Sequence, residues 1–395
     1  MKCLEHFIQG INDKSRNDMR RLKEKILLGL VWTCCLASCS NKDVNDNDVF
    51  FSKSQKNVKT SDIMKDCSLI KLETQDKNLI LDVSMMKIWK DRIYILDCFA
   101  QNKTIWVYDI NGKYVGRIGA LGQGPGEYIM PMSLVVDETN NQILVKDVAQ
   151  NKLLYYDAQT LSCVKEMSIP FYSDCLEYLG PDRLIWYVGS GCANQGDFQK
   201  HIQITDMNLN VVDNFIPRMD FPKRGLYNVM SYFHRYKGNA YFHHPFSEYV
   251  YAYENQSDSI VNEYVLSFEN LQIPSMDYLR NNQKDIIKQL KVDGYIQYYD
   301  LLENDKKILC YFGRNDKAHI GVYSKERKIG YYTEVENLDD DLGILKFIRP
   351  KTVYNDHFVS VVYTEDLEAI TEKSIIYPLV KDETDGGNPI VLLYK

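Results

Sequence analysis

One sequence step recurs at a nearly constant interval along this chain of 395 residues. A strand-like segment ends in aspartate at Asp109 (TIWVYD), Asp157 (KLLYYD) and Asp206 (HIQITD), and the next one ends at Glu254 (YVYAYE). The intervals are 48, 49 and 48 residues. A period of this length, built from short strands and turns, is typical of four-stranded units that bury their faces only against their neighbours. The period therefore predicts a β-propeller, which is one closed body rather than the two or three domains that the length suggests.

The first two units match each other in detail. Residues 91–97 (DRIYILD) precede one Ala-Gln-Asn-Lys segment at 100–103, and residues 141–147 (NQILVKD) precede a second at 149–152. Runs of β-branched and aromatic residues bounded by Asp, Asn and Gly indicate strands. The Asn111-Gly112 dipeptide predicts a tight hairpin turn with positive φ at both central positions.

The number of blades follows from the later spacing. After Glu254, comparable strand ends occur at Ser324 and Lys395. Each of these last two intervals is longer than the period by nearly half of it, and each contains a helix-like stretch, at residues 274–290 and 364–380. We therefore predict an all-β, six-bladed β-propeller with two short helical insertions in blades five and six.

The sixth blade lacks an outermost strand at the C-terminus. Residues 67–73 (CSLIKLE) are predicted to supply it, because exchange of a strand between the two ends of the chain closes the ring and covers an open edge.

The N-terminus has the pattern of an export signal. Residues 19–25 (MRRLKEK) are basic, residues 26–35 (ILLGLVWTCC) are apolar, and Leu-Ala-Ser-Cys39 is a small-residue cleavage site. The apolar run is shorter than the roughly 20 residues of a permanent membrane span. The site resembles the bacterial lipobox, in which the cysteine becomes the lipidated first residue of the mature chain. The alternative is an ordinary secretory signal.

These features divide the chain into three parts. We predict a lipoprotein-type signal segment at 1–38, a flexible tether at 39–58 and the propeller at 59–395, because residues 40–57 are polar and have little structural pattern.

The charge of the chain limits its partners. The whole chain has a net charge of −7, and removal of residues 1–38 takes away seven basic and four acidic residues, leaving 40 basic against 50 acidic. This balance argues against nucleic acid or an anionic membrane surface as a partner, so membrane contact is expected through the lipid only. We expect a monomer.

Beyond Cys39 the chain has six cysteines, and no pair of them has the spacing of a metal site. Most single cysteines within strands are small buried hydrophobic residues. A bridge between Cys175 and Cys192 is an open alternative in an oxidising compartment. We expect no cofactor and no metal.

Three segments carry a resemblance to a known family: residues 121–128 (LGQGPGEY), 70–74 (IKLET) and 388–395 (NPIVLLYK). With these the chain resembles the six-bladed β-propeller lipoproteins of Bacteroidetes, relatives of NHL-repeat propellers. The resemblance covers residues 59–395. It implies the fold and an outer-membrane lipoprotein in the cell envelope, periplasmic or surface-exposed, and it implies little chemistry.

The glycine-rich segment is a candidate site as well as a turn. Its glycines and proline suit a compact connection between blades one and two, and it lacks the Lys-Ser/Thr of a phosphate-binding loop. We expect Glu127 and Tyr128 to lie where the chain enters the central channel, as candidate ligand contacts.

Blade four holds the richest polar and aromatic cluster, on both sides of a turn at 237–239. His234 and Arg235 are the candidate ligand-binding residues there, on opposite faces of one strand, while the adjacent His243 and His244 point apart, which disfavours joint chelation. Ligand binding, metal or catalytic use, and packing are the alternatives. Trp89, Trp106 and Trp186 offer surfaces for sugar rings, against the alternative of packing between blades.

Aspartates are the remaining candidates. Asp97 and Asp147 are expected to accept hydrogen bonds from backbone amides of the next turn, with calcium coordination as the alternative. The run at 339–341 is expected to be a solvated loop rather than a metal site.

Two functions of different classes remain. The first is a lipid-anchored binding or scaffold protein of the cell envelope, without enzymatic activity, for a glycan, peptide or protein partner. The alternative is a propeller hydrolase or lyase that acts on an extracellular polysaccharide. No nucleophile motif, metal spacing or carboxylate pair favours the enzyme. If Tyr128, His234 and Arg235 meet in the channel, they would suit an anionic or hydroxyl-rich ligand such as an acidic sugar.

Overall fold

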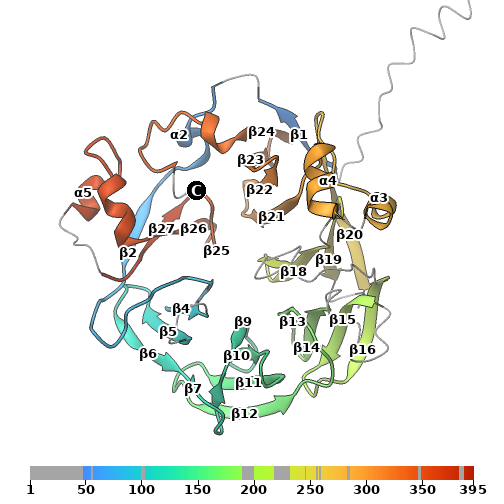
Figure 1. The fold of residues 1–395 in the computed structure, drawn as a ribbon. Coiled ribbons are helices and arrows are strands. Elements are labelled where there is room, and N and C mark those ends of the chain that lie inside the picture. The colour runs from blue at the N-terminus through green and yellow to red at the C-terminus, as the bar shows by residue number, and fades with distance from the viewer. Residues whose placement is uncertain are drawn as a thin grey trace, which may run out of the picture. The chain divides into compact units, whose positions relative to one another are not determined.

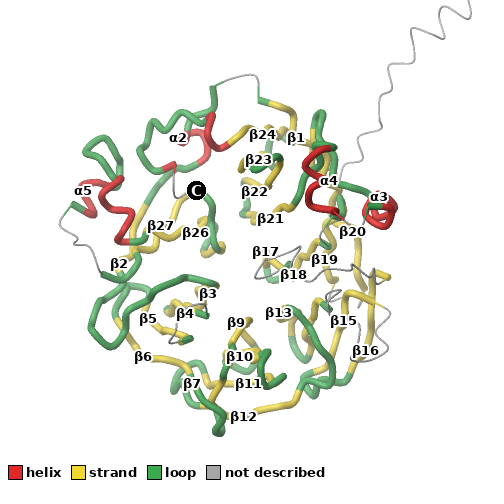
Figure 2. The backbone as a smooth tube through the Cα atoms, in the orientation of Figure 1, coloured by secondary structure: helices red, strands yellow, loops and turns green. Residues whose placement is uncertain are grey.

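Six groups of four antiparallel strands form a ring in the computed structural model of the protein (Figures 1 and 2). The structure describes residues 48–54, 57–98, 103–188, 200–217, 232–244, 246–254, 257, 259–282, 285–345, 348–381 and 387–395. The signal segment and Cys39 lie outside the described residues. The prediction of a six-bladed β-propeller is confirmed.

The first three blades follow one another along the chain, each running from an inner to an outer strand. Blade one consists of β3 (Met85–Trp89), β4 (Arg92–Asp97), β5 (Thr104–Asp109) and β6 (Tyr114–Ile118). Blade two consists of β9 (Pro131–Asp137), β10 (Gln142–Asp147), β11 (Lys152–Asp157) and β12 (Cys163–Ser168). Blade three consists of β13 (Cys175–Gly180), β14 (Arg183–Tyr187), β15 (Lys200–Asp206) and β16 (Val211–Pro217).

The last three blades complete the ring. Blade four consists of β17 (Phe233–Tyr236), β18 (Asn239–His243), β19 (Tyr249–Glu254) and β20 (Ser259–Phe268). Blade five consists of β21 (Tyr298–Glu303), β22 (Lys307–Arg314), β23 (Lys317–Ser324) and β24 (Ile329–Glu334). Blade six consists of β25 (Thr352–Tyr354), β26 (His357–Val362), β27 (Ile390–Tyr394) and the N-terminal β2 (Ser68–Lys71).

The ring is closed as the sequence predicted. Strand β2 pairs antiparallel with β27, and Leu69 lies opposite Leu392. Hydrophobic packing between blades continues around the ring because successive side chains of a strand point to opposite faces. In β10, for example, Ile143 and Val145 pack toward blade one, whereas Leu144 packs toward blade three.

The recurring aspartates fix the outer hairpin in each of the first three blades. Asp109 Oδ1 accepts hydrogen bonds from the amides of Asn111 and Lys113, both at 2.9 Å. Asp206 Oδ1 makes the equivalent bonds to Asn208 and Asn210, and Asp157 Oδ1 bonds the amides of Gln159 and Thr160. The repeat therefore exists because a carboxylate at the end of the third strand satisfies amides that the turn leaves unpaired.

The predicted type of turn at Asn111-Gly112 is wrong. Only Gly112 has positive φ, at 86°, and the register shifts between Val107 and Tyr108. A bulge therefore accompanies the turn, and the glycine occupies its left-handed position. The same position is taken by Leu161 (φ 61°) and Leu209 (φ 65°) in the next two blades.

Helical insertions occur in the two predicted places. Before blade five lie α3 (Met276–Asn281) and α4 (Ile286–Val292), and between β26 and β27 lie η5 (Thr364–Ala369) and α5 (Tyr377–Val380). The Ser275 side chain caps α3 by accepting a hydrogen bond from the Tyr278 amide, as a serine at this position favours. Other short elements are two helical turns, α2 (Thr60–Ile63) and η3 (Val335–Asn337), and a two-residue pair, β7 (Ala120–Leu121) with β8 (Glu127–Tyr128).

One strand lies where the sequence predicted a flexible tether. Residues 39–58 were expected to lack structure, but β1 (Asp48–Lys53) lies between the outer strands β20 and β24 and is parallel to both. It joins blades four and five into one nine-stranded sheet (Figure 1). The tether prediction is therefore wrong for these six residues.

Candidate functional site

The inner strands of all six blades line a central channel. The strands β3, β9, β13, β17, β21 and β25, with their adjoining loops, surround a cavity of about 450 Å³. Figures 1 and 2 together show these strands around the centre of the ring. The volume is within the range of small-ligand sites in proteins.

Two ion pairs connect blades that are not neighbours. On β3, Lys87 Nζ lies 2.6 Å from Glu177 Oε2 of blade three, and Arg235 Nη1 of β17 lies 2.9 Å from Glu138 Oε1, which follows β9 of blade two. Glu177 is almost completely buried. Both cations are therefore neutralised by carboxylates of the same channel.

The segment before β25 adds two further cations. Arg349 Nη2 lies 3.4 Å from Asp300 Oδ2 of β21. The ammonium group of Lys351, in contrast, has no hydrogen bond or ion pair with any described residue, although Lys351 lines the cavity. Among the described residues, none therefore pairs directly with the charge of Lys351.

The protein around these groups changes their titration. Lys351 is exposed to the channel, but the surrounding protein reduces the solvation of its ammonium group and lowers its pKa; Arg349 adds to this shift, while Asp82 and Asp300 oppose it. Burial also raises the pKa of Asp300, against the opposing effect of Arg349. An anion placed next to Lys351 would favour its charged form.

The side chains of the two candidate residues of β17 point in different directions. Arg235 extends along the channel, with its guanidinium group 5.6 Å from the ring centre of Tyr178. His234 points to the interface with blade five, where its Nε2 lies 2.9 Å from Glu303 Oε1 and both side chains are buried. The expectation that they face opposite sides is therefore met.

Glu303 is the centre of a polar network between blades four and five. Lys325 Nζ lies 2.5 Å from Glu303 Oε2 and 3.5 Å from the ring centre of Tyr236. Burial alone would raise the pKa of Glu303, but the hydrogen bond with His234 and the charges of His234 and Lys325 lower it. This network holds the wall of the channel in place.

The structure does not bring Glu127 and Tyr128 to the channel. Tyr128 is fully buried in the core between blades one and two, where its hydroxyl donates to the Ile118 carbonyl at 2.8 Å. Glu127 turns back on its own loop and accepts a hydrogen bond from the Gly124 amide at 2.7 Å. The expected meeting of Tyr128 with Arg235 is therefore wrong, because β8 pairs with β7 beside the outer strands and the chain reaches the inner strand only at Pro131.

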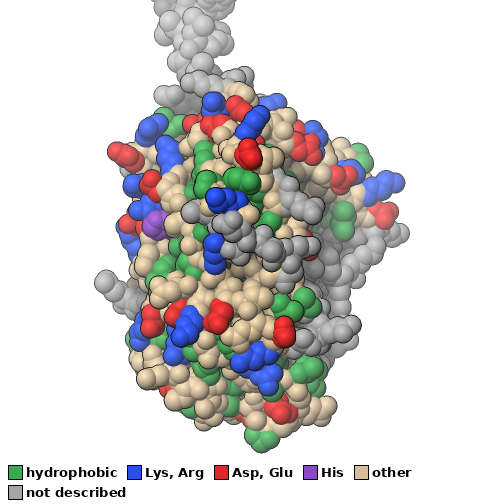
Figure 3. Space-filling view, turned by 90° about the vertical axis from the view of Figure 1, so that its left-hand side faces the viewer, with side chains coloured by type: hydrophobic (Ala, Val, Ile, Leu, Met, Phe, Trp, Pro, Cys, Tyr) green, Lys and Arg blue, Asp and Glu red, His purple; other side chains and the backbone are tan. Residues whose placement is uncertain are grey.

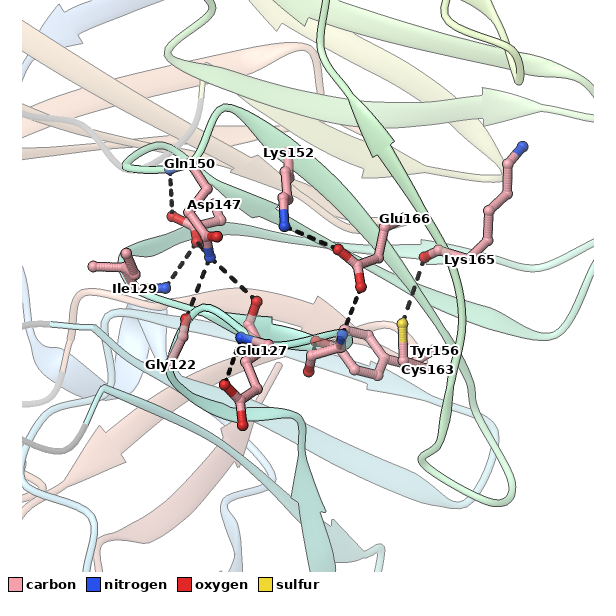
Figure 4. A network of polar contacts seen from close by, with 12 residues as sticks. Gly122, Glu127, Ile129, Asp147, Gln150, Lys152, Tyr156, Cys163, Lys165 and Glu166 are labelled. Atoms are coloured by element: carbon pink, nitrogen blue, oxygen red, sulfur yellow. Dashed lines mark hydrogen bonds and ion pairs between the residues drawn. The ribbon is translucent and has the colours of Figure 1, made fainter.

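The glycine-rich segment is a structural turn, as Figure 4 shows. Asp147 accepts hydrogen bonds from the amides of Ile129 and Met130, and Glu166 of β12 accepts one from the Gly126 amide at 2.6 Å. A Cβ added at Gly122 would collide with the carboxylate of Glu127. The loop thus fastens the outer edges of blades one and two.

The other acidic candidates also bind backbone. Asp147 accepts from the Ala149 amide, as predicted for a turn cap, and Asp97 accepts from the Leu81 amide. In the run at 339–341, Asp341 accepts hydrogen bonds from the hydroxyls of Thr60 and Ser61, and Asp340 accepts them from the amides of Ile344 and Leu345. Asp340 and Asp341 remain exposed, as expected for a solvated loop, and they also anchor α2 and the following loop. Among the described residues no group of three or more His, Cys, Asp or Glu side chains is arranged to hold a metal ion.

The remaining candidates are the cysteines and the tryptophans. The five described cysteines, Cys67, Cys98, Cys163, Cys175 and Cys310, are free thiols, and Cys192 lies outside the described residues. Trp106 and Trp186 are buried in the cores between blades, while Trp89 lines the channel.

Sequence reasoning missed Lys87, Asp300, Arg349 and Lys351. Each lies on or just before an inner strand, so their shared position in the blade was the available signal. The recurring aspartates mark the third strand of a blade, whereas the channel is lined by the first, so the repeat does not indicate these residues.

A known protein family shares this fold. Residues 38–361 match the model of a family described as "6-bladed beta-propeller" (DUF5128). The chain belongs to this family. The predicted membership of a six-bladed propeller family is thereby confirmed.

Two solved structures extend the family comparison. A protein of Bacteroides fragilis NCTC 9343, described as a presumed exported protein, is 25% identical with a TM-score of 0.76, and the match covers 88% of this chain and 99% of that one. A DUF4221-family protein of Bacteroides vulgatus is 10% identical with a TM-score of 0.52, covering 83% and 98% of the two chains. The second shows the fold alone. No curated protein matches the chain.

On the face in Figure 3, basic and acidic side chains are interspersed. No helix within the described part of the chain is long and apolar enough to cross a membrane.

Proposed function

We propose that the protein is a lipid-anchored binding protein of the cell envelope whose central channel holds a carboxylate-bearing ligand, such as an acidic sugar. The observation that carries this proposal is Lys351, a cation in a ligand-sized cavity with no partner among the described residues, beside Arg349. The other four described cations that line the cavity already face carboxylates: Lys87, Arg235, Lys237 and Arg349. The channel can therefore accept one negative group at low electrostatic cost.

The remainder of the wall suits a sugar. The paired side chains of Lys87 with Glu177 and Arg235 with Glu138 present fixed polar atoms that can hydrogen-bond to hydroxyl groups. Trp89 offers an aromatic surface at the same wall. A ring with one carboxylate and several hydroxyls combines both requirements.

The location rests on two observations of different kinds. The Leu-Ala-Ser-Cys39 sequence favours lipidation, and the Bacteroides fragilis relative is described as presumed exported. If Cys39 carries the lipid, Cys39→Ala abolishes incorporation of labelled palmitate and moves the protein from the membrane fraction to the soluble one. Unchanged partitioning would contradict the anchor without affecting the channel.

The binding test uses a glycan array with the wild type, Lys351→Ala and, as a matched control, Lys113→Ala on the exposed outer hairpin of blade one. Loss of one charge-assisted contact is expected to weaken binding of uronic-acid glycans by about tenfold to a hundredfold. Lys113→Ala should bind as the wild type does, and carboxyl-reduced glycans should bind weakly to all three. Equal binding by the wild type and Lys351→Ala, or equal binding of reduced glycans, would overturn the proposal.

One observation favours a lyase as the second candidate. Lys351, with its lowered pKa, lies beside Arg349, and a lyase acting on uronic acids needs a base and a cation that neutralises the carboxylate. Formation of an unsaturated uronate from polysaccharide by the wild type, and its absence with Lys351→Ala, would establish this activity. Binding of the polysaccharide without formation of the unsaturated uronate would instead support a binding protein.

A further inference from the structure

Strand β1 completes the hydrogen bonding of two blades at once. Residues Asp48–Phe51 pair with β20, and residues Phe51–Lys53 pair with β24, both in parallel orientation. The Glu269 amide donates to the Phe51 carbonyl at 2.9 Å, and the Ser54 amide donates to the Tyr332 carbonyl at 3.0 Å. Without β1, the outer strands β20 and β24 would both have unpaired backbone groups. We call the space between these two strands, which is one strand wide, the seam.

The seam also contains a pocket for one side chain, that of Phe51, and we call this pocket the socket. Phe51 is fully buried, and its ring stacks on Phe268 with centroids 5.0 Å apart. Gly321 and Gly330 form the opposite wall: a Cβ at Gly321 would lie 2.9 Å from the Phe51 ring, and a Cβ at Gly330 would collide with the Phe50 carbonyl oxygen. Phe50, the preceding residue of the strand, is 46% exposed.

The contact that holds β1 is small. Of its six side chains only Val49 and Phe51 are buried, and each strand edge is paired over three or four residues. We therefore expect this segment to open locally before the domain unfolds. Beyond it, Lys59 is bridged to Asp339, so the short stretch 54–58 connects β1 to a fixed point of the body.

We infer that the seam between blades four and five is a strand-acceptor site, built for an extended, parallel segment with an aromatic side chain at its centre, and that β1 is an exchangeable occupant. The partner that fits in trans is β1 of a second copy of this chain. Backbone pairing supplies the affinity and the glycine-walled socket supplies the specificity, as in other recognition by strand addition. The short connection favours the chain's own strand, because it keeps β1 at a high effective concentration.

The test uses the full chain with its own strand excluded from the seam. Phe51→Asp places a charge in the socket and should displace β1, whereas the matched control Phe50→Asp places the same charge on the exposed face of the same strand. A labelled peptide of residues 48–54 should bind to Phe51→Asp and not to Phe50→Asp or the wild type. The same peptide with alanine at position 51 should bind about tenfold to a hundredfold more weakly, and alanine at position 50 should have little effect.

Failure of folded Phe51→Asp to bind the peptide, or equal binding of the peptide with alanine at position 51, would overturn the inference. If Phe51→Asp does not fold, hydrogen exchange of the wild type decides instead. The amides of β1 should then exchange faster than those of the central strands β19 and β23, and exchange of β1 only at the rate of global unfolding would overturn it. Neither measurement depends on the ligand of the channel.

Discussion

Glu303 Oε1 lies 2.9 Å from His234 Nε2, and both side chains are almost completely buried between blades four and five. The second oxygen of Glu303 faces Lys325, so one carboxylate balances two side chains. This relationship links the inner strands of two blades at the wall of the channel. It makes the charge of Glu303 important for stability.

Replacement of this carboxylate by an amide should therefore destabilise the protein. Glu303→Gln keeps the shape but removes the charge that faces Lys325 and His234, and loss of one partner of a buried pair costs about 3 kcal/mol. Urea unfolding measures the change. Glu254→Gln, at the exposed end of β19, is the control and should change stability by less than about 0.5 kcal/mol; similar losses in both variants would contradict the role of Glu303.

His243 should make stability depend on pH. Its ring is buried and stacked on Tyr299, and burial, followed by the nearby charge of His234, lowers the pKa of His243 to about 3. Between this value and about 6.5 the unfolded chain binds a proton that the folded chain does not, so stability falls as the pH falls through this window.

The expected loss from this group is about 2 kcal/mol between pH 7.5 and pH 5. His243→Phe keeps an aromatic ring against Tyr299 and cannot titrate, so its unfolding free energy should depend less on pH over the same range. Identical pH dependence in the variant and the wild type would show that His243 does not contribute.

The aspartates that accept hydrogen bonds from backbone amides should contribute more to the free energy of unfolding when they are buried than when they are exposed. Asp147 is fully buried and accepts from the amides of Ile129, Met130 and Ala149, so Asp147→Ala should cost about 3 kcal/mol by leaving amides unpaired. Asp109→Ala removes two bonds on the exposed outer hairpin and should cost about 1 kcal/mol. Thermal or urea unfolding of the two variants gives the comparison, and equal costs would contradict it.

Burial would raise the pKa of Asp147, but its hydrogen bonds lower it. Its contribution is therefore present above about pH 4 and is lost as the pH falls further. Asp147→Asn should reduce this acid-dependent loss.

The two N-terminal strands should not be equivalent. Deletion of residues 59–74 removes β2, exposes the edge of β27 and opens the ring, so aggregation or a large loss of stability is expected. Deletion of residues 48–54 removes β1 and leaves the ring closed, so the protein should remain folded with a smaller loss. Circular dichroism and light scattering distinguish the two, and wild-type melting after loss of β2 would contradict the closure.

The repeat could be predicted because it depends on residues close together in sequence. Asp109, Asp157 and Asp206 each bond amides of the turn that directly follows them, so the chemistry that requires them is visible as a local pattern. The helical insertions were visible for the same reason, through their apolar spacing and the Ser275 cap. The closure followed from the repeat, because the count of strands left the last blade one strand short.

The candidate site could be predicted only in part. Arg235 reaches the channel, but the partners that define its environment, Glu138 and Tyr178, come from two other blades. Glu127 and Tyr128 were misplaced because the local pairing of β7 with β8 keeps the chain at the outer edge. Strand β1 was missed because its partner strands, β20 and β24, belong to blades four and five, far along the sequence, and the segment around it is mostly polar.

The pairing of Leu69 with Leu392 has a consequence for the order of synthesis. Strand β2 is made before all six inner strands of the ring, whereas its partner β27 follows all of them, and β1 likewise precedes β24 by most of the propeller. Contacts of such long sequence separation form late, because the chain must first close very large loops. A ring closed by a pair of strands this far apart in sequence therefore forms late in folding, and such a delay would suit the export that we propose for this protein.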